Sequence, residues 1–307
     1  MLDTPTKRTA APRPRRRPGS EHLTGWAFVT PATVLIVLFG LLPIAWSLLL
    51  SFQKSDLLTP STPWVGTSNY RQLVHDQAFA TAAQHTIVYT ALFVPATMIV
   101  GVLIAVALNR PVRGITFYRT AAYVTIAVST INEAIIFTWL FEPNFGIVNR
   151  VTALVGIPAQ QWLSDPSQAL SVIVIMTVWG WAGFAVIVYL AALQGIPHEL
   201  YDAAAIDGAR PAAMFRTITV PLLSPASLFL AIWLSINALQ LFDEVYLTTR
   251  GGPLHATTVI VYYLWDQAFN QFNAGYAAAL AYVLFMATLV ITFIQFRVGD
   301  RYAHYRR

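Results

Sequence analysis

Six long apolar stretches constrain this chain more than any other feature of its sequence. A hydrocarbon core about 30 Å thick is crossed by roughly 20 apolar residues in a helix. Six stretches reach that length, at 26–52, 86–108, 120–141, 170–193, 221–241 and 276–296. Barrel strands would be segments of about 10 residues with alternating polarity, so the run lengths predict helices. The predicted fold class is all-α, an integral membrane bundle of six transmembrane helices.

The charge content agrees with a chain that is largely surrounded by lipid. Only 11% of the 307 residues are charged and 56% are hydrophobic, whereas a soluble domain carries about 25% charged residues. The formal net charge is +5, but the basic residues lie beside the apolar runs and do not alternate with aromatics, so no nucleic acid is expected as a partner. The absence of cysteine excludes disulfides and thiolate metal sites.

The basic residues also predict the orientation of the chain. Fifteen of the 19 lysines and arginines lie in the two terminal tails and in the loops after the second and fourth stretches, against four on the other side. Positive charge marks the cytoplasmic side, so both termini are expected in the cytoplasm. Residues 1–20 are expected to form a disordered basic tail, 21–300 the transmembrane domain and 301–307 a second basic tail. The first tail either anchors the topology or binds anionic membrane lipid.

A cytoplasmic loop over 194–220 carries the clearest functional pattern. Pro197 can start a helix, Glu199 and Asp202 favour its positive N-terminal end, and Gly208 lets the backbone turn out. Such a helix either docks into a groove of a partner or is an interfacial connector without one. The pattern alone leaves both possibilities open. Pro221 marks the entry into the next span, and the prolines at 31, 43 and 95 are expected to kink or locally unwind their spans.

This loop resembles the EAA loop of ABC importer permeases, whose pattern is Glu-Ala-Ala, three residues, Gly and a later Leu-Pro. Asp202 stands at the glutamate position, Ala203 and Ala204 at the alanines, Gly208 at the glycine and Pro221 at the proline. Aspartate keeps the charge of glutamate with one methylene less. The run Ile206-Asp207-Gly208-Ala209 is similar to the sugar and glycerol-phosphate group of these permeases.

The resemblance extends over residues 24–297. Further matching motifs are Val65-Gly66 with Asn69-Tyr70, Arg113-Gly114 with Phe117-Tyr118-Arg119, and Phe242-Asp243 with Leu247-Thr248 and Gly251-Gly252-Pro253. One departure is Thr125, which stands where the family usually has a proline.

The resemblance implies a type I ABC importer permease fold in the bacterial cytoplasmic membrane. The implied partners are a second homologous permease, two copies of an ATPase and an extracellular solute-binding protein. ATP and Mg are expected on the ATPase, since Lys7 and Lys54, the only lysines here, lie in no phosphate-binding loop. No cofactor, metal site or catalytic residue is expected on this chain, which is a transport subunit and not an enzyme. The residues expected to contact and couple to the ATPase are Glu199, Tyr201, Asp202, Ala203, Ala204, Asp207, Gly208 and Pro221.

Polar and aromatic residues of the spans are candidates for the solute path. Glu133 is the only charge within the six stretches, and a charge at membrane depth usually faces a cavity or a partner. A structural contact with the second permease is therefore its other interpretation. Tryptophans in span four either stack on a sugar ring or pack against helices and lipid. The candidates are Asn132, Glu133, Trp179, Trp181, Asn237 and Gln240, and Asp243 and Glu244 are assigned to an outer gate.

The substrate is predicted from the last third of the chain, which looks most like glycerol-phosphate permeases. That resemblance implies glycerol 3-phosphate or a glycerophosphodiester, with a disaccharide or oligosaccharide as the alternative. The spans contain no cationic residue for a phosphate. An ion-gradient-driven transporter is the other functional class, but it would favour several intramembrane acids or an internal repeat.

Overall fold

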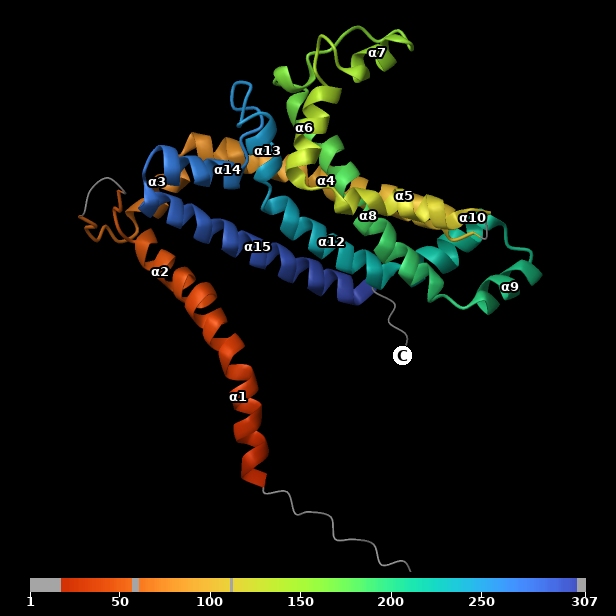
Figure 1. Cartoon of the computed structure of the whole chain (residues 1–307), viewed down its shortest axis with the longest axis horizontal. Helices are drawn as coiled ribbons and strands as arrows, with labels where there is room; N and C mark the ends of the chain where they lie inside the picture. The colour runs from red at the N-terminus through yellow and green to blue at the C-terminus, as the bar shows by residue number, and fades with distance from the viewer. Residues whose placement is uncertain (1–17, 57–60, 111–112, 303–307) are drawn as a thin grey trace, which may run out of the picture. The chain divides into compact units, whose positions relative to one another are not determined.

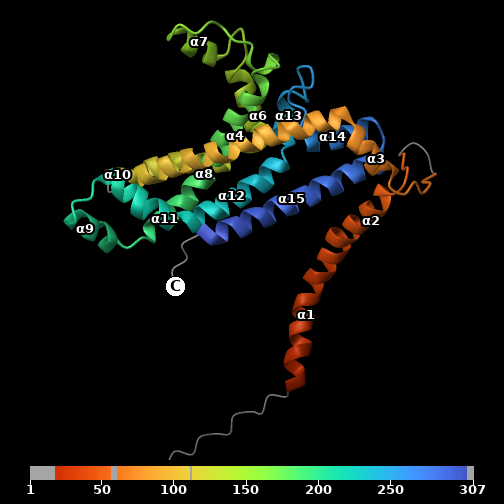
Figure 2. The same ribbon diagram turned by 180° about the vertical axis from the view of Figure 1, so that it is seen from behind.

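The computed structural model describes residues 18–56, 61–110 and 113–302, and Figures 1 and 2 show it from opposite sides. Regular elements among these residues are helical, apart from two isolated antiparallel bridges, Gln53 with Trp64 and Asp56 with Asn273. The chain divides into two compact units, one ending at Leu49 and the other beginning at Leu50, and each is considered by itself. Residues 1–17 and 303–307 of the predicted tails lie outside the described residues, and helix begins at Pro18.

The first unit is one apolar helix. α1 (Pro18–Ile36), the π-helical turn η1 (Val37–Leu41) and α2 (Leu42–Ser51), whose last two residues belong to the second unit, follow one another directly. The stretch Gly25–Ser51 is long and apolar enough to cross a membrane. The π turn lies just before Pro43, whose ring has no N–H to donate to the preceding turn. Pro31 lies inside α1, which continues through it.

The second unit contains three further helices that are long and apolar enough to cross a membrane. They are α4 (Gln77–Leu108), α8 (Ala169–Gln194) and α15 (Ala274–Tyr302). Pro95 lies inside α4. The shorter helices in the connections are α3 (Ser68–His75), α7 (Ile147–Ala153), the 3₁₀ turn η2 (Trp162–Ser164), α9 (His198–Ile206), α13 (Asp243–Thr248), α14 (Ile260–Trp265) and the π turn η4 (Asp266–Asn270). The described residues therefore contain four straightforward candidate spans, and six if each of two bent helix pairs counts as one.

The third predicted span is a broken pair of helices. α5 (Ile115–Ala127) and α6 (Thr130–Leu140) meet at 101°. Val128 and Ser129 take extended backbone between them, and the Ser129 hydroxyl accepts a hydrogen bond from the Asn132 N–H at 3.5 Å. A serine in this position caps a new helix. Apolar run length does not reveal the break, because the polar residues from Ser129 to Glu133 are too few to end the run.

The predicted fifth span is also bent. α10 (Pro211–Met214), the π turn η3 (Phe215–Thr219) and α11 (Val220–Leu222) form one arm, and α12 (Ser224–Leu239) forms the other at 62°. Pro221 and Pro225 flank the bend. Neither proline has an N–H to donate, and each disfavours helical backbone at the residue before it. The entry at Pro221 is therefore a bend and not the start of a straight span.

α8 is the centre of the second unit, where it packs against α4, α5, α6 and α12. α12 and α15 run side by side in both views (Figures 1 and 2). A Cβ on Gly101 of α4 would lie 2.5 Å from the Ala185 Cβ of α8, and one on Gly183 would lie 2.5 Å from the Thr125 Oγ1 of α5. Small residues allow this close approach, which holds helices together in lipid. Larger side chains fill the space between α4, α8 and α12, among them Tyr89, Phe93, Ile173, Met176, Leu230 and Leu234.

Asp76 joins three helices at the start of α4. Its Oδ1 accepts the N–H groups of Ala78 and Phe79 at 2.9 and 3.2 Å, which caps α4. Its Oδ2 accepts the hydroxyls of Tyr263 of α14, at 2.6 Å, and of Tyr276 of α15. Burial by itself raises the pKa of the Asp76 carboxyl, but the tyrosine hydroxyls and backbone N–H groups together outweigh it and hold the pKa below its ordinary value.

Asp76→Asn should lower the melting temperature of the purified protein at pH 7 by a few degrees, or about 1–2 kcal/mol, since an amide has only one acceptor oxygen and cannot accept both the tyrosine hydroxyls and the backbone N–H groups. The folded pKa is depressed, so the stabilisation is complete above the unfolded pKa, about 3.9, and is lost as pH falls through the folded value. Melting curves in detergent should therefore show a difference between wild type and Asp76→Asn that shrinks below about pH 4. A difference independent of pH would contradict this account, and Asp207→Asn, on an exposed side chain, serves as the control.

Candidate functional site

The loop between α8 and α10 forms the short helix α9 at one end of the second unit (Figure 1), as predicted. Pro197 stands immediately before its first turn. Gly208 has a φ of +77° just beyond its end. The Gly208 N–H donates to the Ala205 carbonyl at 3.0 Å, and the Ala209 N–H donates to the Ala204 carbonyl at 2.9 Å. This is a Schellman motif, in which a left-handed glycine lets the last carbonyls of the helix find donors.

α9 exposes one face and attaches the other to the bundle. Tyr201 and Ala204 are half-buried, and the Tyr201 hydroxyl lies 2.9 Å from the Thr219 Oγ1, in the arm that leads to Pro221 of α11 and then to α12. Ile206 is 87% exposed. The remaining predicted coupling residues are also exposed, namely Glu199, Asp202, Ala203, Asp207 and Gly208. α9 is therefore fixed both to α8, which it follows, and to the arm before α12.

A polar cavity of about 210 Å³ lies between α4, α6, α8, α12 and α13. Asn237 and Gln240 both face it, as their spacing of three residues predicts. The Asn237 Nδ2 donates to the Trp233 carbonyl at 2.8 Å. The predicted path and gate residues that the structure brings together here are Trp181, Asn237, Gln240, Asp243 and Glu244.

The cavity is acidic. Asp243 and Glu244 are its carboxylates, and no lysine, arginine or histidine of the described residues lines it. Burial raises the pKa of the Glu244 carboxyl above its ordinary value, and the neighbouring charge of Asp243 adds to the rise. The rings of Phe93, Trp181 and Phe242 supply apolar faces beside these groups. Aromatic faces combined with amides and carboxylates suit a ligand with an apolar ring face and many hydroxyls.

Asn132 and Trp179 lie outside this cavity. Asn132 is exposed on α6. Trp179 is two residues from Trp181, which places the two rings on nearly opposite sides of α8. Its ring centroid lies 5.6 Å from that of Phe137, and it lines a separate, mainly apolar hollow together with Thr125. The packing interpretation of Trp179 therefore agrees with its surroundings better than the stacking interpretation does.

Glu133 is buried between α6 and α8. Its side chain is only 7% exposed, and a Cβ on Gly180 would lie 2.7 Å from either carboxylate oxygen, so the glycine makes room for the carboxylate. Its Oε1 has no hydrogen-bond partner among the described residues. A buried carboxylate without a partner is costly. A contact with a second permease chain, suggested by the sequence, would supply that partner and stays a prediction.

Five further side chains line the cavity without having been predicted as path or gate residues, namely Tyr89, Phe93, Thr130, Leu241 and Phe242. Tyr89 and Phe93 are four residues apart on α4 and stack with ring centroids 5.3 Å apart. A tyrosine within a mainly apolar span was the available signal for them. Thr130 follows the break between α5 and α6, which the run length did not reveal. Among the residues that the structure describes, no three histidine, aspartate or glutamate side chains are grouped so as to hold a metal ion.

Helices long enough to cross a membrane, a polar cavity between them and an exposed, capped helix at one end agree with the membrane component of a transport system. The chain belongs to the family of binding-protein-dependent transport system inner membrane components, whose sequence profile matches residues 87–303. It is thus a multi-pass permease of an ABC importer in the inner membrane, and it is related to permeases for sugars and for glycerol phosphate.

Two relatives and one solved structure illustrate the relationship. The chain is 36% identical over 280 residues to the lactose transport system permease protein LacF of Rhizobium radiobacter, covering 89% of this chain and 93% of LacF. It is 31% identical over 285 residues to the sn-glycerol-3-phosphate transport system permease protein UgpA of Yersinia pestis, covering 92% and 95%. Its fold matches a crystal structure of the bacterial alginate ABC transporter in complex with alginate pentasaccharide-bound periplasmic protein, with a TM-score of 0.81 and 22% identity over 92% of this chain and 96% of that one.

Gly180→Ala should push the Glu133 carboxylate out of its place, because the added methyl would stand 2.7 Å from its oxygens. We expect a loss of about 1–3 kcal/mol in stability, read as a lower melting temperature in detergent. The same change in a Glu133→Ala background should cost less than about 0.5 kcal/mol, since the clashing group is gone. Equal losses in the two backgrounds would show that Gly180 does not act through Glu133.

Proposed function

We propose that this chain is one of two permease subunits of an importer driven by two copies of a separate ATPase and supplied by an extracellular solute-binding protein. The observation that carries the proposal is α9, which is closed by Gly208, exposed along its acidic and small-residue face, and fastened to the bundle by Tyr201. Its uncovered Ile206 and its neighbouring acids suit a groove on a partner. ATP and Mg would bind the partner ATPase, with no cofactor on this chain.

In this proposal, movement of the ATPase subunits shifts α9 and with it the helices that line the cavity. α9 follows α8 through Ile196, which is only 7% exposed, and Tyr201 joins it to the arm before α12. α8 and α12 contribute Trp181 and Asn237 to the cavity. Nucleotide binding shifts the balance between inward and outward states only if the ATPase contacts α9 differently in the two.

The orientation follows from the basic residues. With α9 and both termini in the cytoplasm, the N-terminal end of α4 and the helices α3 and α14 would face outward. The basic tail would then lie beside the cytoplasmic leaflet, where it could bind anionic lipid.

We propose an uncharged saccharide as the transported solute. The cavity combines aromatic rings with amides and two carboxylates and has no cation among the described residues, and carboxylates repel a phosphate at short range. The name of LacF supports a sugar as well. Glycerol 3-phosphate or a glycerophosphodiester, favoured by the last third of the sequence and by the name of UgpA, is the second candidate. For that solute the partner permease would have to supply the cationic groups.

Gly208→Pro should abolish ATP-dependent solute uptake by the assembled importer in proteoliposomes. Proline fixes φ near −65°, whereas Gly208 has +77° and donates its N–H to Ala205. We expect uptake to fall at least about tenfold while the subunits stay assembled. Uptake is measured in parallel with radiolabelled lactose, trehalose, glycerol 3-phosphate and a glycerophosphodiester, so that the same assay identifies the substrate class.

The matched control is Gly156→Pro. Gly156 has a similar φ of +79° with open space around its Cα, but it lies in the connection between α7 and α8. This variant should keep uptake within about twofold of wild type. Uptake without ATP, or full uptake by Gly208→Pro, would contradict the coupling role of α9 and favour a transporter driven by an ion gradient.

A further inference from the structure

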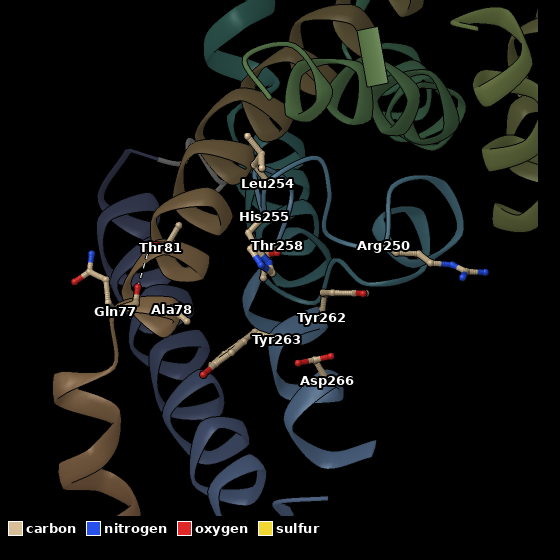
Figure 3. Close-up of a pocket in the computed structure, with 10 residues that line it drawn as sticks. All are labelled: Gln77, Ala78, Thr81, Arg250, Leu254, His255, Thr258, Tyr262, Tyr263 and Asp266. Atoms are coloured by element: carbon tan, nitrogen blue, oxygen red, sulfur yellow. Dashed lines mark hydrogen bonds between the residues drawn. The ribbon is translucent and has the colours of Figure 1, made fainter. Parts of the chain in front are cut away.

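A second cavity, of about 390 Å³, lies at the start of α4 (Figure 3). Gln77 and Thr81 of α4, the loop before α14, and Tyr262 and Asp266 line it. α4 has 32 residues, so at 1.5 Å per residue its two ends are about 45 Å apart. Its other end lines a hollow together with Tyr201 of α9. The cavity around Tyr262 therefore lies on the side of the bundle away from the proposed ATPase contact.

The loop that covers this cavity has an unusual backbone. Arg250, Leu254 and His255 all line the cavity and all have a positive φ, of 51°, 50° and 61°. Residues other than glycine rarely take this conformation. Strained residues of this kind persist where the surrounding structure holds them, and they cluster at ligand-binding sites.

Hydrogen bonds from threonines hold the loop in this conformation. The Thr249 and Thr257 hydroxyl oxygens lie 2.7 Å apart, and the Thr257 hydroxyl donates to the Gly252 carbonyl at 2.8 Å. The Thr258 carbonyl lies 3.1 Å from the Nδ1 of His85 on α4. The loop is therefore preorganised, and ligand binding would not have to order it.

The side chains around the cavity suit a neutral ligand with many hydroxyls. Tyr262 offers an aromatic ring and Asp266 offers a carboxylate, whereas the Gln77 amide points away from both (Figure 3). His255 adds an imidazole, and the Arg250 guanidinium extends away from Asp266 at the edge of the group (Figure 3). A sugar hydroxyl both donates and accepts, so it is satisfied by such a mixture, whereas a phosphate dianion would call for an excess of cations.

A cluster of aromatic rings in contact lies between the two cavities. Phe242 lines the cavity around Trp181, and its ring centroid lies 6.3 Å from that of Tyr262 in the second cavity. Tyr246 and Trp265 complete the cluster, with centroids 5.3 Å between Phe242 and Tyr246, 4.9 Å between Tyr246 and Trp265, and 5.7 Å between Tyr262 and Trp265. A sugar could move by stacking first on one aromatic ring of this cluster and then on the next.

We propose that the cavity around Tyr262 is an outer saccharide site, which holds a sugar before it passes along the Phe242–Tyr262 cluster to the cavity around Trp181. The transport direction rests on the proposed function, but binding at the outer site can be measured without transport.

The test uses the importer assembled in nanodiscs, without ATP or binding protein. The chain has no cysteine, so Leu254→Cys, at an 88% exposed position on the loop, takes a single environment-sensitive fluorophore on this subunit. Lactose, trehalose, maltose and glycerol 3-phosphate are titrated separately. We expect a saturable change in emission with at least one of the saccharides, at a concentration at least about tenfold lower than for glycerol 3-phosphate.

Two controls locate the signal. A complex with the unsubstituted chain, treated with the same fluorophore, reports any label on partner subunits. Leu154→Cys, at an 85% exposed position that does not line the cavity, should show no change. Tyr262→Ala and Asp266→Asn should weaken the response at Leu254→Cys about tenfold, whereas Asn237→Ala in the other cavity should leave it unchanged.

Absence of a response to every saccharide, a preference for glycerol 3-phosphate, or a response that depends on Asn237 and not on Asp266 would overturn the outer site. The first of these results is also expected if the cavity instead receives a segment of the binding protein. ATP-dependent uptake is measured on the same preparation. Uptake without an outer-site response would refute this inference alone, whereas loss of ATP dependence in the wild type would refute the proposed function itself.

Discussion

The close approach of α8 to its neighbours is the contact on which the second unit depends. Ala185 meets Gly101 of α4, Gly183 meets Thr125 of α5, and Gly180 leaves space for Glu133 of α6. Apolar side chains gain little by leaving lipid for one another, so tight van der Waals contact at small residues has to hold the helices together. α8 is thereby fixed on three sides, and the proposed solute path and the proposed ATPase contact are both built on it.

The position of α8 explains how a movement at one end of the bundle can reach the cavity. Trp181 and Ile196 are 15 residues apart, or about 22 Å along the chain if helical. Ile196 is buried where the chain leaves α8 for α9. Because packed interfaces switch between discrete arrangements more readily than they deform, a displacement of α9 would move α8 as a body. α9 has a second connection, through the Tyr201 hydroxyl, to the arm before α12. This arm meets α12 at the bend at Leu223.

Sequence reasoning located the apolar spans and α9. Run length is a local property, and so are the helix-starting Pro197 and the helix-ending Gly208. The same reasoning missed the bend at Val128–Ser129, since the few polar residues from Ser129 to Glu133 still leave a run long and apolar enough for one span. It could not separate Trp181 from Trp179, because α8 is apolar on all sides and its pattern does not show which face meets the cavity. The Asp76–Tyr276 contact joins residues 200 positions apart, and the left-handed backbone of Leu254 and His255 follows from the surrounding threonines. Both depend on tertiary contacts that no local pattern records.

The most direct test of the central claim, that α9 controls access to the cavity around Trp181, is the labelling rate of a cysteine at Gln240. This residue is exposed and lines the cavity, and the chain has no other cysteine. A membrane-impermeant maleimide is applied from the outside to the assembled importer in proteoliposomes, with the ATPase either free of nucleotide or trapped with a non-hydrolysable ATP analogue and the binding protein. The account predicts at least about fivefold faster labelling in the trapped state, and no such difference when Gly208→Pro is added. Equal labelling rates with and without nucleotide would contradict it.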